Sequence, residues 1–248
     1  GVGAFVAIVA IDLGAAGLAS QPSIEAMTNR ALFVIFPLVV AGLASSLLHL
    51  GAPRNAWRAL ANVRSSWLSR EILFALAYCA FAGVFAVLRW SGAGSPFLRS
   101  AAAIGATLSG IAMVYAMARV YRLRTVPAWD SPLTTTSFFA TTLLLGSLLM
   151  AVLITLLPGV PEVIASAPLR QLALVAAGCF AVEIAIEERR VPHGIRRLLL
   201  LAGLAFCSTQ ALSNGRATPA AVLAFGVAIA TQILGRHRFY LAGLRRTL

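Results

Sequence analysis

The sequence predicts an all-α integral membrane protein, a bundle of eight transmembrane helices. Of its 248 residues 60% are hydrophobic and only 11% are charged, and the mean hydropathy is +0.88. Soluble domains contain roughly 45–50% apolar and about 25% charged residues. A soluble chain of this composition would expose much of its Leu, Ala, Val and Phe to water, whereas a bilayer accepts them. The apolar runs are continuous and do not alternate, which favours helices over a membrane barrel.

Eight apolar segments approach the length of about 20 residues that a spanning helix needs. They are 2–19, 31–50, 72–88, 101–120, 134–157, 171–186, 198–212 and 219–234. The sixth and seventh segments are short, so we expect their ends to lie close to interfacial Arg residues. The longest polar connection, 51–70, is too short for a soluble domain. We therefore expect residues 1–248 to form a single transmembrane domain, and the first residues do not resemble a signal peptide.

The basic residues are all Arg, and they are distributed unevenly between the two sides of the predicted bundle. With eight spans, 15 of the 20 lie on the side that carries both termini, and five lie on the other. The five are Arg30, Arg89, Arg99, Arg170 and Arg216. By the positive-inside rule the Arg-rich side is cytoplasmic. The alternative is that some of these Arg residues dock a partner protein.

Two ionisable residues lie where spans meet the Arg-rich side, at one membrane depth. His49 lies at the end of the second predicted span and Glu71 at the start of the third. A quinone headgroup needs hydrogen-bond donors and a route for protons, and an imidazole and a carboxylate near one interface meet both needs. The alternative is a His that caps its helix and a Glu that the helix dipole favours at an N-terminus.

Other polar residues have two interpretations each. Tyr115, Arg119 and Arg122 lie at i, i+4 and i+7, near the end of the fourth span, and therefore share one helix face. An Arg there either snorkels to the headgroups or orients Glu71 or a bound quinone oxygen. Asp12, within the first span, either bonds a neighbouring helix or belongs to a proton path.

Several kinds of centre are not expected in this chain. A haem b in a membrane bundle commonly needs two His ligands inside the spans, and only His49 is at a span. The three Cys residues, Cys79, Cys179 and Cys207, show no paired spacing, so a zinc site or an iron–sulfur cluster is not expected. No catalytic motif for a polar substrate is visible, and no nucleic-acid partner is expected.

Several segments resemble one known family, the membrane-anchor subunit of DMSO reductase (the DmsC family). The stretch 46–64 resembles its His-Leu-Gly-x-Pro segment, with His49 at the His position, and 65–71 resembles the Ser-x-Leu-Ser-x-Glu continuation, which ends at Glu71. Residues 119–121 with 125–129, and residues 234–240, resemble further family signatures. The similar segments follow in order along nearly the whole chain.

The resemblance implies an eight-helix anchor, itself non-catalytic, for a molybdopterin catalytic subunit held through an iron–sulfur subunit. It implies electron exchange with a quinone, ubiquinone or menaquinone, near His49 and Glu71. We expect Arg64, Arg119 and Tyr121 to contribute to quinone binding or proton transfer. Docking of the iron–sulfur partner is expected at a set of Arg residues on the same side: Arg54, Arg58, Arg122, Arg124 and Arg236.

The charge distribution departs from the well-known members of the family, whose docking face points to the periplasm. Here the Arg-rich face is predicted to be cytoplasmic, in a bacterial inner membrane. This favours the similar anchors of cytoplasmic sulfite-oxidising molybdoenzymes, which reduce quinone. The alternatives are a periplasmic reductase of DMSO or related S- or N-oxides that oxidises menaquinol, an anchor without a quinone site, and a small-solute transporter. A transporter is disfavoured because the polar groups gather at one interface and not at the bilayer midplane.

Overall fold

The computed structural model describes residues 1–16, 18, 21–48, 60–127, 129–157, 161–190, 194–212 and 218–244. Within these ranges the chain forms eight α-helices and one 3-10 turn, without a strand. In order they are α1 (Val2–Gly14), α2 (Gln21–Leu48), η2 (Leu60–Asn62), α4 (Trp67–Ser91), α5 (Pro96–Tyr121), α6 (Pro132–Leu156), α7 (Glu162–Arg190), α8 (Ile195–Leu212) and α9 (Thr218–Leu244).

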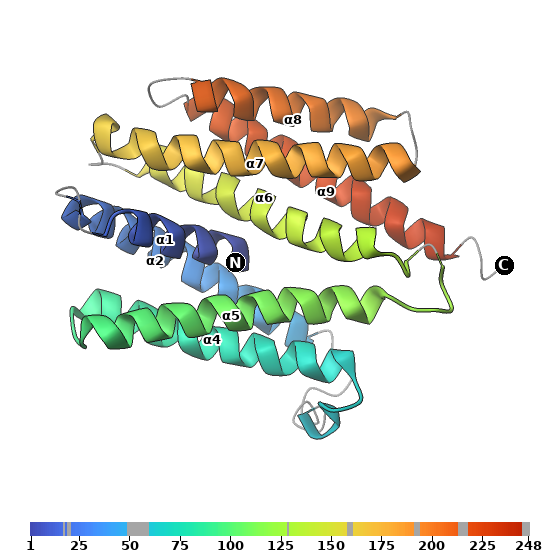
Figure 1. Ribbon diagram of the computed structural model, residues 1–248, viewed down its shortest axis with the longest axis horizontal. Helices are drawn as coiled ribbons and strands as arrows, with labels where there is room; N and C mark the ends of the chain where they lie inside the picture. Colours follow the sequence, from blue (N-terminus) through green and yellow to red (C-terminus); the bar gives the residue numbers. More distant parts are fainter. Residues whose placement is uncertain are drawn as a thin grey trace.

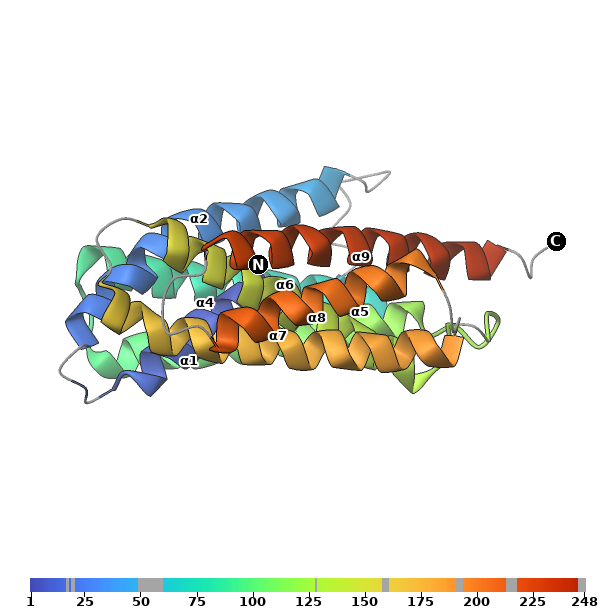
Figure 2. The same cartoon turned by 90° about the horizontal axis from the view of Figure 1, so that it is seen from above.

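The helices run along one common direction, as two perpendicular views show (Figures 1 and 2). Helices α6 to α9 form one half of the bundle, in which each helix contacts the next. Helices α4 and α5 form a pair in the other half, with α2 beside them. Helix α1 contacts α2, α5 and α6 and so joins the two halves.

Seven helices, α2 and α4 to α9, are long and apolar enough to cross a bilayer. Large apolar side chains such as Phe33, Leu108 and Leu174 are more than half exposed on the outside, as lipid contact requires. Helix α1 has 13 residues and is therefore about 20 Å long, shorter than the roughly 30 Å hydrocarbon core. The predicted helical membrane bundle is confirmed, although the first helix is shorter than the expected span 2–19.

Two helices begin well before the apolar segments that predicted them. Helix α2 begins at Gln21, ten residues before the predicted start, because its polar residues Thr28 and Asn29 bond a neighbouring helix. Helix α7 begins at Glu162, nine residues before the predicted start, and continues through Pro168. An acidic residue is stabilised in the first turn of a helix, and a hydropathy window does not detect this effect. The sixth span is therefore long, with 29 residues, and not short as predicted.

A buried arginine, Arg89, ties α4 to α1 and α2. Its Nη1 lies 2.8 Å from Asp12 Oδ2, its Nε donates to Asn29 Oδ1 at 2.6 Å, and its Nη2 donates to Thr28 Oγ1 at 2.7 Å and to the Glu25 carbonyl. The side chain of Arg89 is only 6% exposed. Asp12 therefore bonds neighbouring helices, as one of the two interpretations from the sequence had it.

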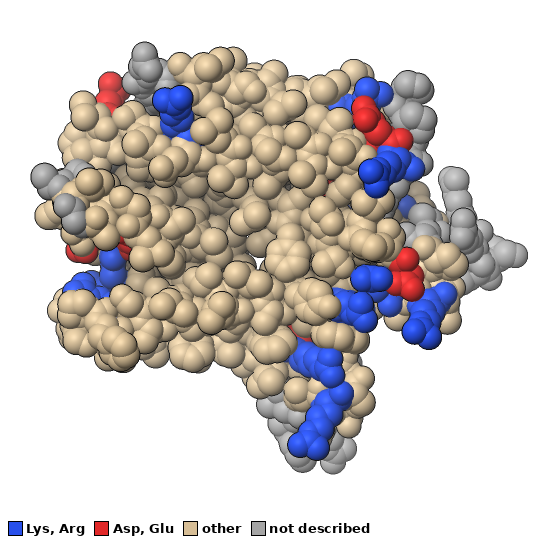
Figure 3. Space-filling model, in the orientation of Figure 1, with Lys and Arg blue, Asp and Glu red and all other residues tan. Residues whose placement is uncertain are grey.

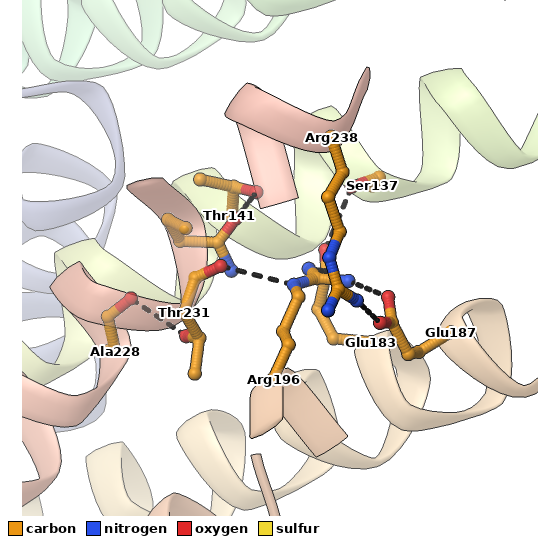
Figure 4. Close-up of polar contacts among 9 residues, drawn as sticks. Ser137, Thr141, Glu183, Glu187, Arg196, Ala228, Thr231 and Arg238 are labelled. Atoms are coloured by element: carbon orange, nitrogen blue, oxygen red, sulfur yellow. Dashed lines mark hydrogen bonds and ion pairs between the residues drawn. The ribbon is translucent and has the colours of Figure 1, made fainter. Parts of the chain in front are cut away.

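A second buried arginine, Arg196, ties α8 to α7 and α9 near the opposite end of the bundle (Figure 4). Its Nη2 lies 2.6 Å from Glu183 Oε2, and its Nη1 pairs with Glu187 Oε2. Its Nε donates to the Thr231 carbonyl oxygen at 3.1 Å. Glu183 and Glu187 are one helical turn apart on α7, so both carboxylates face the same guanidinium.

Residues from α6 and α9 complete this arginine cluster. Ser137 Oγ donates to the second carboxylate oxygen of Glu183 at 2.9 Å, and Arg238 pairs with Glu187 at 2.6 Å. Gly235 leaves the space that the Arg196 guanidinium fills, because a Cβ there would lie only 2.8 Å from Nη2. The cluster therefore joins all four helices of this half.

The two halves meet most closely where α1 crosses α6. Gly3 and Gly146 face each other there, and a Cβ on either residue would overlap the backbone of the opposite helix. Small residues let membrane helices approach closely, which increases van der Waals contact between their backbones.

We expect Arg196→Met to lower the free energy of unfolding by about 3–5 kcal/mol, because it leaves the buried Glu183 without a cation and removes one of the two cations that pair with Glu187. Denaturant titration in detergent, followed by circular dichroism, measures the loss. The control is Arg197→Gln, next in the chain, whose pair with Glu188 is 3.0 Å long but partly exposed. Its loss should not exceed about 1 kcal/mol. Equal losses in both variants would contradict the role of the cluster.

We expect Gly146→Ala to lower the free energy of unfolding by about 1–3 kcal/mol, because α1 and α6 must move apart to accommodate the methyl group. The same titration measures this change. Gly178→Ala on α7 is the matched control, since a Cβ there meets nothing within 4 Å. Ala is the better helix former, so the control should be neutral or slightly stabilising. A Gly146→Ala variant as stable as the control would show that the crossing does not require glycine.

Candidate functional site

The described Arg residues gather at one end of the bundle, which we call the Arg-rich end (Figure 3). There α2, α5, α7 and α9 finish and α4, α6 and α8 begin. The Arg residues of this end are Arg64, Arg70, Arg119, Arg122, Arg124, Arg189, Arg196, Arg197, Arg236 and Arg238. Those on the helices' other ends are Arg30, Arg89, Arg99 and Arg170.

Glu71 lies in the second turn of α4, close to the Arg-rich end. Helix α4 begins there because Ser66 caps it, accepting a hydrogen bond from the Ser69 backbone N–H. Arg70 donates to the carbonyls of Val63 and Arg64 and so fixes the chain that enters the helix. The Glu71 carboxylate has no hydrogen bond or ion pair with any residue that the structure describes.

Glu71 lines a cavity of about 240 Å³, which we call the Glu71 cavity. The other walls come from α1, α2, α4 and α5 and are almost entirely apolar: Gly1, Val2, Leu38, Val39, Gly42, Leu43, Ala75, Tyr78, Cys79, Met113 and Met117. Pockets for drug-sized ligands are usually 300–1,000 Å³, so this cavity suits one ring. A lone carboxylate in such walls can exchange a proton with a bound, uncharged ring.

Arg119 lies near the end of α5, where an aromatic ring positions it. Its guanidinium carbon is 5.0 Å from the centre of the Trp67 ring, and that of Arg70 is 4.3 Å from the same ring. Tyr115 meets the Trp67 ring edge-on at 5.7 Å. Trp67 thus orders two cations at the start of α4. The Arg119 Nε is buried and has no hydrogen-bond partner in the described part of the chain.

Sequence reasoning did not identify Trp67, nor the two methionines of the cavity wall. Met113, Met117 and Tyr121 recur at a spacing of four residues, which places them on one face of α5. The face that the sequence analysis selected, with Tyr115 and Arg119, instead meets Trp67. The regular methionine spacing was the available signal, since methionine adapts well to binding surfaces.

Tyr121 lies in an aromatic cluster between the end of α5 and the end of α9. Its hydroxyl is 3.1 Å from the Tyr240 hydroxyl, and its ring packs against Phe138 at 5.5 Å. Trp129 stacks on Phe239 at 5.1 Å and donates from Nε1 to the Phe239 carbonyl at 2.7 Å. The cluster therefore connects the segment after α5 to the last helix.

The predicted docking residues have different environments. Arg122 pairs with Asp130 at 3.2 Å, and Arg124 is exposed in the same connection between α5 and α6. Arg236 is half-buried, with its guanidinium carbon 3.8 Å from the centre of the Phe138 ring. Arg64 is exposed after η2.

Three predicted site residues, His49, Arg54 and Arg58, lie outside the described residues. Across the ranges that the structure describes, no three His, Cys, Asp or Glu side chains converge on a point that could hold a metal ion.

Comparison with known proteins places these features in a family. Residues 1–196 match the family described as "DMSO reductase anchor subunit (DmsC)". The chain belongs to this family. A relative is the C component of the anaerobic dimethyl sulfoxide reductase of Escherichia coli, 30% identical over 237 residues, 88% of this chain and 82% of that protein. No solved structure matches the chain.

Two shorter matches carry different names. The C component of the anaerobic dimethyl sulfoxide reductase of Haemophilus influenzae is 33% identical over 118 residues, 48% of this chain and 42% of that protein. The C component of the sulfite dehydrogenase of Allochromatium vinosum is 33% identical over 112 residues, 41% of this chain and 34% of that protein. The chain spans less than half the length of these two relatives in the match.

In this DmsC-family protein, two segments that resemble family signatures, 119–129 and 234–240, contact each other although about a hundred residues separate them. Trp129 and Tyr121 come from the first segment, and Phe239 and Tyr240 from the second. The family match ends at residue 196, so it does not include the second segment.

Proposed function

We propose that this chain anchors a molybdenum oxidoreductase in the membrane and exchanges electrons between its iron–sulfur subunit and a quinone, ubiquinone or menaquinone. The chain would be a non-catalytic subunit, with the quinone site as its only redox site. The observation that carries the proposal is Glu71, an unpaired carboxylate in an apolar cavity at the Arg-rich end.

The pairing of other carboxylates supports a role for Glu71. Asp12, Glu183 and Glu187 each have an arginine partner within the bundle. An unpaired carboxylate at membrane depth is costly, and such residues usually serve a function. A quinone supplies two-electron chemistry that is coupled to two protons. We propose that Glu71 takes up or delivers one of these protons at its carboxylate oxygens.

The remaining predicted residues support this site in different ways. His49 directly follows Leu48, the last residue of α2, and this helix lines the cavity with Leu43 and Gly42. We propose that His49 donates a hydrogen bond to the quinone headgroup. Arg119, ordered by Trp67, would orient a quinone oxygen or the Glu71 carboxylate.

Tyr121 and Arg64 have supporting roles in the proposal. The Tyr121 hydroxyl is within hydrogen-bond distance of the Tyr240 hydroxyl, and Tyr240 is exposed. Arg64 lies at the aqueous approach to α4. Each would assist proton movement or headgroup binding at the edge of the site.

We propose that the iron–sulfur subunit docks on the Arg-rich end and in turn holds the molybdopterin subunit. Exposed cations there complement an acidic partner surface and would guide its association. Arg124 is exposed, and Arg122 is half-buried and paired with Asp130. Arg54 and Arg58 belong to the connection between α2 and α4. Arg236 is half-buried, so it would attract the partner through its positive electrostatic potential and not by direct contact.

The asymmetry of the Arg residues supports a cytoplasmic Arg-rich end in a bacterial inner membrane. A cytoplasmic catalytic subunit favours sulfite oxidation with reduction of the quinone, in keeping with the name of the Allochromatium vinosum relative. The second candidate is reduction of DMSO or a related oxide, in keeping with the names of the other two relatives.

We expect Glu71→Gln to lower quinone-linked turnover about 100-fold or more, because the amide cannot exchange the proton. Turnover of the catalytic subunit with a soluble redox dye should not change, since the dye bypasses the membrane site. Both rates are measured on the purified complex with each redox partner in excess.

The control for this test is Glu188→Gln, a change of the same charge at the same end of the bundle, on a carboxylate 48% exposed and paired with Arg197. It should leave both rates unchanged. Normal quinone-linked turnover of an assembled Glu71→Gln complex would remove Glu71 from the mechanism.

Helix α9 ends at the Arg-rich end, which we propose is cytoplasmic. We therefore expect a fluorescent protein fused after Leu248 to fluoresce, and alkaline phosphatase fused there to be inactive. The two reporters mature on opposite sides of the membrane, so their activities measured in whole cells report the side directly. Active phosphatase would place this end in the periplasm and favour the reductase alternative.

A further inference from the structure

We propose that Tyr78 donates a hydrogen bond from its hydroxyl to one oxygen of the quinone in the Glu71 cavity, the oxygen that lies farther from Glu71. This inference rests on the proposed function, because it takes a quinone as the occupant of the cavity. Tyr78 lies seven residues after Glu71 on α4 and therefore deeper in the bundle, away from the Arg-rich end.

Tyr78 combines nearly complete burial with an unused hydroxyl. The residue lines the Glu71 cavity and is only 3% exposed. Its hydroxyl has no hydrogen-bond partner among the described residues. A buried hydroxyl without a partner has lost the hydrogen bonds that water would provide, which is costly and therefore uncommon in folded proteins. A carbonyl oxygen bound in the cavity would supply the missing acceptor.

The tyrosine ring is held by helices on two sides. It meets the Phe5 ring of α1 edge-on, with the ring centres 5.9 Å apart. On α5 it packs where Gly110 has no side chain, since a Cβ there would lie 3.2 Å from Cδ2 of Tyr78. Side chains on a helix lean toward its N-terminus, so the ring of Tyr78 is directed toward the end of α4 at which Glu71 lies.

The spacing of Glu71 and Tyr78 matches the length of a quinone ring. Positions i and i+7 share one face of a helix, and seven residues span about 10 Å along its axis. The two carbonyl oxygens of a quinone lie on opposite sides of the ring, about 5 Å apart. With a hydrogen bond of about 2.8 Å at each oxygen, the groups that hold the ring lie about 10–11 Å apart. One ring in the cavity therefore reaches both side chains.

The two side chains would have different tasks. Glu71 lies close to the Arg-rich end and exchanges a proton with the nearer quinone oxygen. Tyr78 has no hydrogen-bonded neighbour in the described part of the chain that could return a proton to it. Tyr78 therefore binds and orients the ring and does not supply a proton. Its loss weakens quinone binding and leaves the rate at saturating quinone unchanged.

Steady-state kinetics of the purified complex with a short-chain ubiquinone or menaquinone test the inference. Tyr78→Phe keeps the ring and removes the hydroxyl, so it should raise the KM for the quinone about fivefold, the effect of one neutral hydrogen bond. The kcat and the turnover with a soluble redox dye should not change. Thr107→Val is the matched control, because it removes another buried hydroxyl without a described partner, on α5 and not in the wall of the cavity. It should leave the KM unchanged.

Infrared difference spectroscopy of the bound quinone gives a second readout, which a role of Tyr78 in packing alone would not change. A hydrogen bond lowers the stretching frequency of a carbonyl group. In the unmodified protein both C=O bands should therefore lie below those of the same quinone in hydrocarbon, and Tyr78→Phe should raise one of them. The first of these measurements needs no variant, so it holds even if Tyr78→Phe does not assemble.

An unchanged KM in an assembled Tyr78→Phe complex, or a C=O band at the hydrocarbon frequency in the unmodified protein, would overturn the role of Tyr78. The proposed function would still stand if Glu71→Gln lost quinone-linked turnover in the same assay. Normal turnover in both variants would instead remove the quinone from this cavity, and the inference about Tyr78 with it.

Discussion

Hydrocarbon offers no water to a charged group, so an arginine inside this bundle needs acceptors from the protein itself. Arg89 finds them on α1 and α2, and Arg196 finds them on α7 and α9. Each cluster orders one half of the bundle, and the two lie at opposite ends. The helices that carry the acceptors cannot slide or rotate without leaving a charge unpaired, which fixes their register more firmly than apolar side chains alone could.

Against this background the Glu71 cavity differs from the rest of the bundle. The arginine clusters contain complementary charges at 2.6–2.8 Å. Glu71 has a cavity in front of it, and the guanidinium groups of Arg70 and Arg119 lie over the Trp67 ring. Neither of these cations forms an ion pair with the Glu71 carboxylate. This combination suits a group that must change its protonation state while the fold stays constant.

The sequence predicted the helices well and the partners of their polar residues poorly. Continuous apolar runs are sufficient to locate membrane helices, because the bilayer imposes their length. Hydropathy could not show that α2 starts at Gln21, since the polar first turns of this helix are ordered by Arg89, about sixty residues later. Glu71 was selected from its position at a span end, and its role in quinone chemistry stays a prediction. Trp67 and the methionine wall depend on how α4 and α5 face each other, which spacing within one helix does not determine.

The role of α9 bears on the order in which the protein is assembled. This helix follows α8 in the chain, and it brings the Thr231 carbonyl, the space at Gly235, and the rings of Phe239 and Tyr240. Until it inserts, Arg196 lacks one of its three acceptors, and Trp129 lacks both its stacking partner and its carbonyl acceptor. Insertion of α9 therefore completes the polar contacts of α8 and of the connection between α5 and α6, so the Arg-rich end folds fully only after this helix has joined the bundle.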